Sequence, residues 1–497
     1  MSLSTPTRPD LTSLFHGLPD ALAPQRTPHL SQLTQLVEAF RRQPPTPART
    51  HQFENDVAVR LRELGRSVVE WTVNHLEADE ARAVPTQILW QGQAYQRRPK
   101  SHNRSLACLF GPIQLQRYRY EPIDGGDQAL FPLEIALGIE AERATPALAE
   151  RAAQAAASQT QGQVRELLAR QHGVTWSVKV LRKVTAAVSR GLAEQRQAVQ
   201  AGRLVKALQQ AEASVGSHRP TVCVGRDGVM VPLRGRHDYA EASAATVSVR
   251  DRQGRRLYTA YLGRMPEKEQ KTLSTQLTGL LLLLPTLWTG TALRWQYLSD
   301  GGQQPSAYFR LVLRQLRDPR TGRRWCWERV LDFYHASTYI TKLAEALFGG
   351  TRAGLAWAAK MRHWLRHKPG GIQRVLYSAA ALRARYELTA AEEKAYDRAW
   401  GYLQKRKRHM DYAGYKRRGL ALGTGVTEAA CKTVFTQRLK QSGMRWHKEG
   451  GQVIVDLRVL VLSGVWDEAY QAYLGSKPQL ETGTLAGRST GTAKKAA

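Results

Sequence analysis

Cysteine is scarce in this sequence. The four cysteines, Cys108, Cys223, Cys326 and Cys431, lie far apart, and no two of them form a C-x-x-C pair. They therefore provide neither a disulfide framework nor a cysteine-based zinc site. Isolated thiols of this kind are typical of a protein that works in a reducing compartment.

Long apolar runs are also missing. The most apolar stretch, LTGLLLLLPTLW at 277–288, is too short to cross a bilayer and contains Pro285, so it predicts a buried helix and its end. The first residues, MSLSTPTRPD, contain no apolar signal core. We therefore expect a soluble, cytoplasmic protein with no membrane partner.

Acidic residues are few beside the basic ones. The 497 residues include 73 Lys and Arg but only 42 Asp and Glu, which gives a formal net charge of +31. A chain of this length exceeds one hydrophobic core, so two or three domains are expected. The positive excess runs through most of the chain, which favours nucleic acid over a membrane patch as partner. The alternative is that the basic surface only keeps the protein soluble.

The first 215 residues are predicted to form a mostly helical DNA-binding region after a proline-rich lead. Residues 1–50 are expected to be disordered or loosely ordered. From 51 to 215, helical apolar spacing begins in FENDVAVRLRELGRSVVEWTVNHLEADEA. The segments ILWQGQAYQRR and GPIQLQRYRYEP then alternate apolar with basic residues, which predicts an exposed antiparallel hairpin. Its basic side chains are Arg97, Arg98, Arg117 and Arg119.

Two short amphipathic stretches in RELLARQHGVTWSVKVLRKVTAAV are joined by a turn around Gly173. This pattern is similar to a helix-turn-helix, although an ordinary pair of helices explains it equally well. If the motif reads DNA, Ser177, Lys179 and Arg182 would lie on the second helix, where groove contacts are usually made.

The pattern changes at about residue 216. Strand-like segments such as TVCVGRDGVMVPLRG and ALRWQYLSD alternate with helical ones as far as 335, which predicts a mixed α/β sheet with a site at its strand ends. The order fits a ribonuclease-H-like core. Residues 336–420 are nearly all helical and densely basic, so they are predicted to be a helical insertion. Residues 421–474 complete the core, and 475–497 are expected to be a disordered tail.

Three carboxylates stand at informative positions. Asp227 follows the strand TVCV, Asp300 follows another strand, and Glu428 lies in the first turn of a helix predicted from near Thr427. Together they could hold two divalent ions through oxygen ligands. Two ions about 4 Å apart stabilise the attacking and leaving oxygens of a phosphoryl displacement. Taken singly, each residue also has a structural explanation: a hairpin corner, an Asx turn and a charge at a helix N-terminus.

The stretches GRDG, LSDGG, LDFYHA and GTGVTEAACKTVFTQRLKQSGMRW resemble the DDE transposases of bacterial insertion sequences, most closely the Kra-four family of the Mutator-like group. The resemblance covers about 85–470 and is most specific in the last stretch. It implies a ribonuclease-H-like core with an all-helical insertion, and a metal-binding catalytic triad of Asp227, Asp300 and Glu428. The cofactors would be two Mg²⁺ ions, for which Mn²⁺ can substitute.

The same resemblance implies the partners and the place of action. The protein would cleave double-stranded DNA at the terminal inverted repeats of its element and join the 3′ ends to target DNA. It would work as at least a homodimer, because two ends must be brought together, and it would associate with the bacterial nucleoid. A catalytically inactive DNA-binding relative, or a nuclease on the same fold, is the alternative.

Relatives in the Mutator-like group carry a C/D-x-x-H pattern between the second Asp and the Glu, and here it falls on Asp332 and His335. Asp332 also follows a strand, so it competes with Asp300 as second ligand; the LSDGG match and the helix after it favour Asp300. His335 is expected to orient a carboxylate or phosphate, because hard Mg²⁺ prefers oxygen ligands. A purely structural hydrogen bond between Asp332 and His335 is the alternative.

One segment departs from the family. Relatives often carry a Cys-containing, zinc-ribbon-like segment just after the early hairpin, but EPIDGGDQALFPLE contains no Cys. No structural zinc is therefore predicted there, and the DNA grip of the hairpin is less well supported.

Basic residues around the Glu428 helix are expected to contact DNA. Lys432 lies four residues after Glu428, on the same helical face, where it could meet a phosphate. Trp446 could stack on an unpaired base or pack in the core. The basic runs at 405–408 and 416–418 could instead be solvated helix faces. The other candidates are Arg438, Lys440, Arg445, the run Lys405, Arg406, Lys407 and Arg408, and the run Lys416, Arg417 and Arg418.

Overall fold

The computed structural model describes residues 22–77, 84–126, 128–235 and 239–480. Contacts divide the chain into two compact units. One unit comprises Met1–Val188 with Leu474–Ala497, and the other comprises Ser189–Tyr473. Within the described ranges, no helix is long and apolar enough to cross a membrane. The predicted lead and tail fall partly outside these ranges, at 1–21 and 481–497.

The first unit begins with two helices, α1 (Ala23–Arg41) and α2 (Pro47–Asn74). The prediction of a loosely ordered lead is therefore wrong for residues 23–41. Pro24 and Pro47 lie in the first turns of α1 and α2, where a missing N–H costs little, whereas Pro28 lies inside α1. Thr46 caps α2 by accepting a hydrogen bond of 3.2 Å from the backbone N–H of Arg49.

A three-stranded antiparallel sheet follows, made of β1 (Gln87–Trp90), β2 (Gln93–Cys108) and β3 (Gly111–Pro122) in that order. The predicted pairing of β2 with β3 is confirmed. The segment ILWQGQAYQRR, predicted as a single strand, is itself a hairpin of β1 and β2. Its chain reverses at Gln91 and Gly92, which both adopt positive φ, as tight hairpin turns require.

The arginines predicted on an exposed hairpin differ in burial. Arg117 is only 3% exposed and contacts Glu134, so the expectation of exposure is wrong at this position. Arg98 contacts Glu121, and Arg119 Nη2 lies 3.1 Å from the other oxygen of the same carboxylate. Much of the positive charge of this sheet is therefore already paired within the first unit.

Helices α3 (Pro132–Ala136), α4 (Pro146–Ser158) and α5 (Gln161–His172) lead to the long α6 (Val178–Ala213), which runs on into the second unit. Gly173 ends α5 in the left-handed conformation, with φ 65°, so the predicted turn is confirmed. The second helix of the supposed motif is not short, however, because α6 has 36 residues. The side chains of Ser177, Lys179 and Arg182 are exposed.

The second unit contains a five-stranded mixed sheet of order β6–β5–β4–β7–β8. The first three strands pair antiparallel, whereas β7 and β8 run parallel to the central strand β4. The strands are β4 (Thr221–Pro232), β5 (Tyr239–Arg250), β6 (Arg256–Arg264), β7 (Arg294–Ser299) and β8 (Trp327–Leu331). The prediction of an α/β fold is confirmed at this level.

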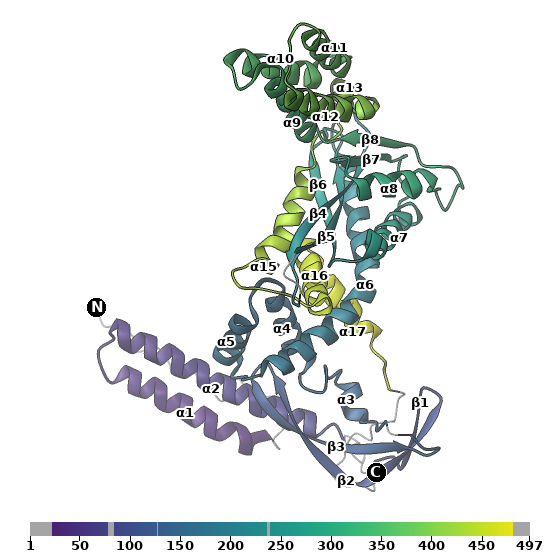
Figure 1. Ribbon diagram of the computed structural model, residues 1–497. Helices are drawn as coiled ribbons and strands as arrows, with labels where there is room; N and C mark the ends of the chain where they lie inside the picture. The colour runs from purple at the N-terminus through teal and green to yellow at the C-terminus, as the bar shows by residue number, and fades with distance from the viewer. Residues whose placement is uncertain (1–21, 78–83, 127, 236–238, 481–497) are drawn as a thin grey trace. The chain divides into compact units, whose positions relative to one another are not determined.

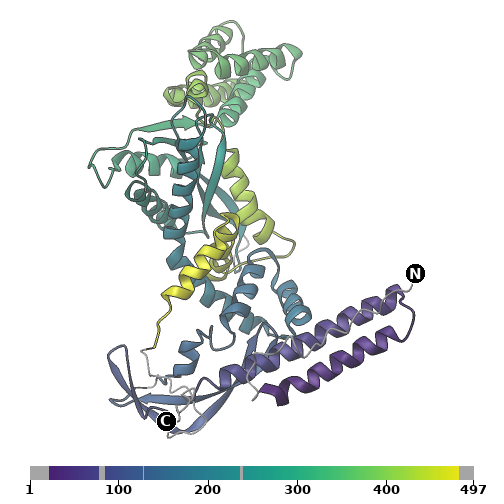
Figure 2. The same ribbon diagram turned by 180° about the vertical axis from the view of Figure 1, so that it is seen from behind.

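Helices cover both faces of this sheet. On one face, α7 (Lys271–Leu287), α8 (Gln303–Leu311) and the second half of α6 share a hydrophobic core with alternate residues of the strands. Figure 2 shows the second half of α6 running along the strands. On the other face lie α14 (Gly425–Ala430) and α16 (Lys448–Leu462). Gly263 of β6 leaves room there, because a Cβ atom at this residue would lie 2.8 Å from the Val455 side chain.

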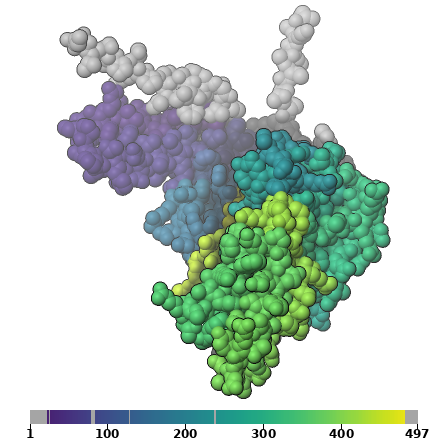
Figure 3. All heavy atoms as spheres, turned by 90° about the horizontal axis from the view of Figure 1, so that it is seen from above, coloured from purple at the N-terminus to yellow at the C-terminus, as the bar shows by residue number. Residues whose placement is uncertain are grey.

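Five helices between β8 and α14 form a helical block, whose hydrophobic core continues onto residues of β4, β7 and β8. They are α9 (Phe333–Phe348), α10 (Arg352–His367), α11 (Gly371–Arg383), α12 (Ala390–Arg406) and α13 (Tyr412–Arg417). Figure 1 places this block beyond the ends of β7 and β8, and Figure 3 shows it in green as one continuous mass of side chains. The helical content predicted for 336–420 is confirmed.

The chain after α14 continues as a π-helix (Cys431–Thr436) and a short α15 (Gln437–Leu439). The last helices are α16 and α17, which spans Trp466–Ser476. The predicted helix with Glu428 in its first turn is therefore present, but its geometry changes within two turns. Single π turns of this kind occur often at functional sites, because they re-aim side chains.

Candidate active site

Asp227 lies on β4, and Asp300 is the first residue after the neighbouring parallel strand β7. The parallel strands β4 and β7 pair with Gly225 opposite Leu298. Asp227 and Asp300 each come two residues later, and a step of two along a strand keeps a side chain on the same face. Both residues are half-buried. The two carboxylates therefore project from the same face of the sheet, at the edge where β7 ends.

Helix α14 carries Glu428 across this same face. The preceding residue, Thr427, is buried, and its Oγ1 lies 2.9 Å from Oγ1 of Thr246 on β5. Gly225 of β4 permits this approach, because a Cβ atom there would lie 2.0 Å from the Thr427 hydroxyl oxygen. Glu428, which follows the buried Thr427, has an exposed side chain.

Electrostatics show that the three carboxylates lie close enough to interact. The pKa of Asp227 is raised to about 6, mainly by burial and in smaller part by the negative charges of Asp300 and Glu428, while a hydrogen bond from the Gly228 N–H opposes the rise. Among the described residues, no group of three or more His, Cys, Asp or Glu side chains already has metal-ligand spacing. The sheet and helix thus gather the three groups, and ligation would require their side chains to turn toward one another.

Asp300 also makes the turn that its sequence suggested. Its Oδ1 accepts a hydrogen bond of 2.8 Å from the N–H of Gly302, and Gly301 between them has φ +83°. This Asx turn uses one carboxylate oxygen, which leaves the other available. The turn and the placement beside Asp227 are therefore compatible.

Asp332 has a different role from Asp300. It is 1% exposed and caps α9, with Oδ1 accepting hydrogen bonds from the N–H groups of Tyr334 (2.6 Å) and His335 (3.2 Å). Its Oδ2 accepts from the Thr424 N–H at 3.0 Å and contacts the Thr424 hydroxyl. That hydroxyl lies 2.6 Å from Oε1 of Glu428. Both oxygens of Asp332 are thus engaged, and the residue supports Glu428 through Thr424.

His335 lies next to an aromatic pair and not at the carboxylates. Its half-buried ring is 5.5 Å from the Tyr339 ring and 5.8 Å from the Tyr402 ring. Its link to Asp332 is made by the backbone N–H. The alternative prediction, a structural hydrogen bond between Asp332 and His335, is confirmed, and the backbone N–H of His335 makes this bond.

Cys431 was not selected from the sequence as a site residue. It is buried at the start of the π-helix, and its thiol donates to the carbonyl oxygen of Gly228, the residue after Asp227, at 3.9 Å. Burial, followed by the charge of Asp227, raises the pKa of this thiol, which is therefore a neutral neighbour of the carboxylate. Its position three residues after Glu428, close to one helical turn, was the signal that could have indicated it.

The candidates for DNA contact around Glu428 fall into two groups. Lys432, Lys440 and Arg445 are exposed, so they stay candidates. Arg438 is 1% exposed, and burial lowers its pKa to about 10. The prediction that this residue contacts a phosphate directly is therefore wrong. Trp446 is held as a structural residue: its indole N–H donates to a backbone carbonyl at 2.9 Å and its backbone bridges to Leu233.

The two basic runs are similarly divided. Lys405, Lys407 and Arg408 are exposed, whereas Arg406 is half-buried and packs over the Tyr402 ring at 4.1 Å. In the second run Lys416 and Arg417 are exposed. The third member, Arg418, is half-buried and pairs with Glu328 at 2.8 Å. Each run therefore offers fewer cations to a partner than its sequence suggests.

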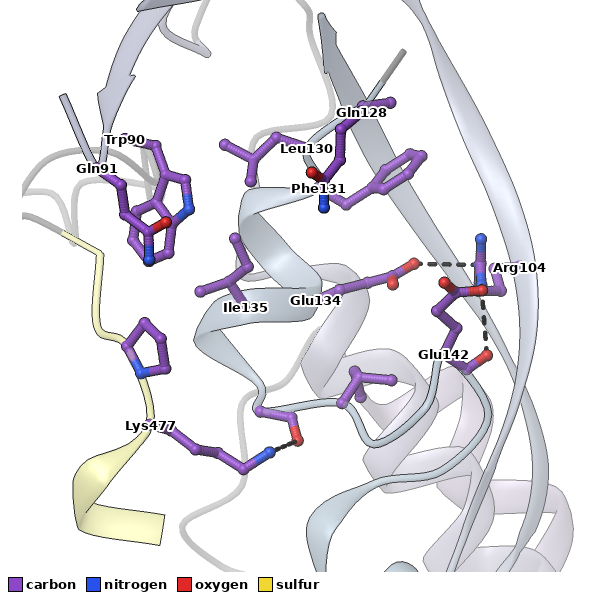
Figure 4. A pocket seen from close by; sticks show the side chains of 14 residues that line it. Trp90, Gln91, Arg104, Gln128, Leu130, Phe131, Glu134, Ile135, Glu142 and Lys477 are labelled. Carbon is purple, nitrogen blue, oxygen red and sulfur yellow. Dashed lines mark hydrogen bonds and ion pairs between the residues drawn. The ribbon is translucent and has the colours of Figure 1, made fainter. Parts of the chain in front are cut away.

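A cavity of about 450 Å³ in the first unit has no group of carboxylates like that of the candidate active site. Figure 4 shows Trp90, Phe131 and Ile135 among its lining side chains. Its acidic groups, Glu134 and Glu142, both pair with Arg104, at 3.2 and 3.0 Å. Its charged groups are thus paired with one another, and the cavity has the character of a structural hollow.

Comparisons with known proteins identify no relative of this chain. No protein-family model matches the sequence, and no curated protein is significantly similar to it. The family suggested by the sequence motifs therefore stays a prediction.

Proposed function

We propose that the protein is a DDE transposase, which cleaves DNA at the terminal inverted repeats of its element and joins the 3′ ends to target DNA. The observation that carries the proposal is the level placement of Asp227 and Asp300 on one sheet face, beneath the helix that carries Glu428. The net charge of +31 supports a polyanionic substrate. The four sequence motifs that resemble the Kra-four family add independent support.

The strand order supports a ribonuclease-H-like core for this activity. Three consecutive antiparallel strands are followed by two parallel ones, and the first strand lies at the centre of the sheet. In such a core, the helical block would be an insertion between the last strand and the helix of the catalytic Glu. Parallel strands place their chain ends at a common edge, which is where ligands usually bind in α/β sheets.

The donor set fits hard divalent cations. Asp227, Asp300 and Glu428 offer only carboxylate oxygens, which Mg²⁺ and Mn²⁺ prefer. Burial is the main cause of the raised pKa of Asp227, and the negative charges of Asp300 and Glu428, which a cation would offset, add to it. These three residues would hold two such ions, which would supply positive charge for phosphoryl transfer. Thr424, held by Asp332, keeps Glu428 oriented, and the Asx turn orients Asp300.

The test is a nicking and strand-transfer assay on DNA that carries the ends of the element, with Mg²⁺ and with a chelator. Cleavage followed by joining supports a transposase, and cleavage without joining supports the nuclease alternative. Binding without either reaction under Mg²⁺ or Mn²⁺ supports an inactive DNA-binding relative. Sedimentation with and without paired ends tests the proposed dimer.

A further inference from the structure

Seven arginines and no lysine occur in residues 303–331, from α8 through β8. The only acidic residues in this stretch are Asp318, which lies 4.0 Å from Arg320, and Glu328, which pairs with Arg418. Most of the positive charge here is therefore not balanced locally. The arginines are Arg310, Arg314, Arg317, Arg320, Arg323, Arg324 and Arg329.

Two arginines of the loop between α8 and β8 donate hydrogen bonds to backbone carbonyl groups. The Arg317 and Arg320 guanidinium groups donate to the carbonyl oxygens of Gly322 and Trp288, each at 2.9 Å. These two arginines build the loop. Its other basic side chains are exposed and take no part in these bonds; they are Arg314, Arg323 and Arg324.

A second group of arginines gathers at the outer edge of β8. Arg329 is half-buried, with its guanidinium 4.9 Å from the centre of the Phe309 ring. Burial lowers its pKa, and the nearby charges of Arg408, Arg406 and Arg310 lower it further. Several cations are thus held near one another by the fold, an arrangement that an anionic partner would relieve.

The two groups of arginines together extend from the active site to the other end of the sheet, where β7 and β8 begin. At one end, Arg406 Nη2 donates to the carbonyl oxygen of Gly301, the residue after Asp300, at 3.3 Å. At the other end, the loop precedes β8 and lies where β7 and β8 begin, as Figure 1 shows. A strand of five residues such as β8 spans about 16 Å. That length corresponds to about five base pairs of duplex.

We propose that this arginine surface binds the phosphate backbone of the DNA duplex that extends away from the catalytic carboxylates. The surface consists of Arg310, Arg314, Arg323, Arg324, Arg329 and Arg408. The identity of the duplex as a transposition substrate rests on the proposed function, whereas the binding itself does not.

A duplex fits this surface better than a small anion does. One group of cations lies around Arg329 and the other lies in the loop before β8, so the surface extends over more than one point along this strand. Guanidinium groups present paired donors that match phosphate oxygens, so an all-arginine composition favours a backbone contact. Such contacts position the duplex without reading its sequence.

The test replaces Arg314, Arg323 and Arg324 together by Gln in the full-length protein and titrates a mixed-sequence DNA duplex at several salt concentrations. Each phosphate that is no longer neutralised lowers the slope of log affinity against log salt by about one unit, so the slope should fall by about two to three units. The matched control replaces three exposed arginines of the helical block, Arg352, Arg385 and Arg398, by Gln. The control should change the slope little.

An unchanged slope in the loop variant, in a protein that still unfolds at the wild-type temperature, would overturn the proposal. An equal fall in both variants would also overturn it, because total charge and not this surface would then explain the binding. Cleavage with Mg²⁺ is measured on the same samples. If the salt slope falls only in the loop variant but the wild-type protein does not cleave DNA, the proposed catalysis is refuted and the proposed surface stands. If the wild-type protein cleaves DNA but the slope falls equally in both variants, the proposed surface is refuted and the proposed catalysis stands.

Discussion

The hydroxyl group of Tyr402 donates a hydrogen bond of 2.7 Å to the backbone carbonyl oxygen of Asp300. Tyr402 belongs to α12 of the helical block, and its ring stacks on Tyr339 of α9 at 3.6 Å. Arg406, one turn later in α12, covers the other side of the ring at 4.1 Å. The helical block therefore holds the turn that carries the proposed second metal ligand.

Tyr402→Phe should slow DNA cleavage without weakening DNA binding. The variant keeps the stacked ring and removes only the hydrogen bond to Asp300, so the carboxylate is oriented less tightly. We expect single-turnover cleavage to fall about tenfold, equivalent to about 1.4 kcal/mol of barrier. Tyr377→Phe, on the exposed side of α11, is the control and should cleave normally. Normal cleavage by Tyr402→Phe would show that the bond has no positioning role.

Asp300→Asn should abolish most cleavage while leaving DNA binding largely intact. The change removes one negative charge at nearly constant shape, so a bound cation loses an anionic ligand. The measurement is Mg²⁺-dependent nicking beside a binding titration. If the variant cleaves almost normally, the role of second ligand passes to Asp332.

Thr424→Val should lower cleavage, and Thr424→Ser should retain it. The valine variant keeps the shape of the side chain but lacks the hydroxyl that touches both Asp332 and Glu428. Asp332 then loses one of its donors in a buried site, at a cost of about 1–3 kcal/mol in unfolding free energy. A serine variant as slow as the valine variant would show that the threonine methyl group matters, and not the hydroxyl.

The run at the end of α12 should contribute to DNA binding through its exposed members only. Replacing Lys405, Lys407 and Arg408 by Gln should lower the salt slope of DNA binding by about one unit for each phosphate that these side chains neutralise in the wild type. Arg406→Gln should instead slow cleavage, because this side chain packs on Tyr402 and donates to Gly301. An unchanged slope in the triple variant would exclude this run from the DNA path.

Glu77→Gln should stabilise the first unit at high pH. Burial raises the pKa of Glu77 to about 7, against a hydrogen bond from the Tyr118 N–H and the charge of Arg117. The folded state thus binds the proton of the Glu77 carboxyl group more tightly than the unfolded state does. The free energy of unfolding therefore falls as the pH rises from 4.5 to about 7. The variant avoids that loss.

The gain should approach about 3 kcal/mol at most at pH 8 and should vanish below about pH 4, where the carboxyl is protonated in both the folded and the unfolded state. Denaturant unfolding at the two pH values measures it. Glu54→Gln, at an exposed site on α2, is the control and should show no such gain. A constant difference between Glu77→Gln and the wild type across this range would contradict the prediction.

The sequence by itself determined the helices and strands, and which of these elements the three carboxylates belong to or follow. Strand and helix are set by local periodicity, which is why the pairing of β2 with β3, the alternation from residue 221 onward and the helix of Glu428 could all be predicted. The Asx turn at Asp300 is likewise local chemistry. The helix at residues 23–41 was missed because proline content was taken as evidence of disorder, although proline is well tolerated in a first helical turn.

Only the tertiary structure decided which charged side chains face solvent. Arg117, Arg406 and Arg418 have sequence contexts as basic as those of their neighbours, yet each contacts a residue brought in by the fold: Glu134, Gly301 and Glu328. The strand register, and with it the level placement of Asp227 and Asp300, likewise depends on β4 pairing with β7, a strand far along the chain. Burial and register arise from contacts between distant parts of the chain, so no local pattern encodes them.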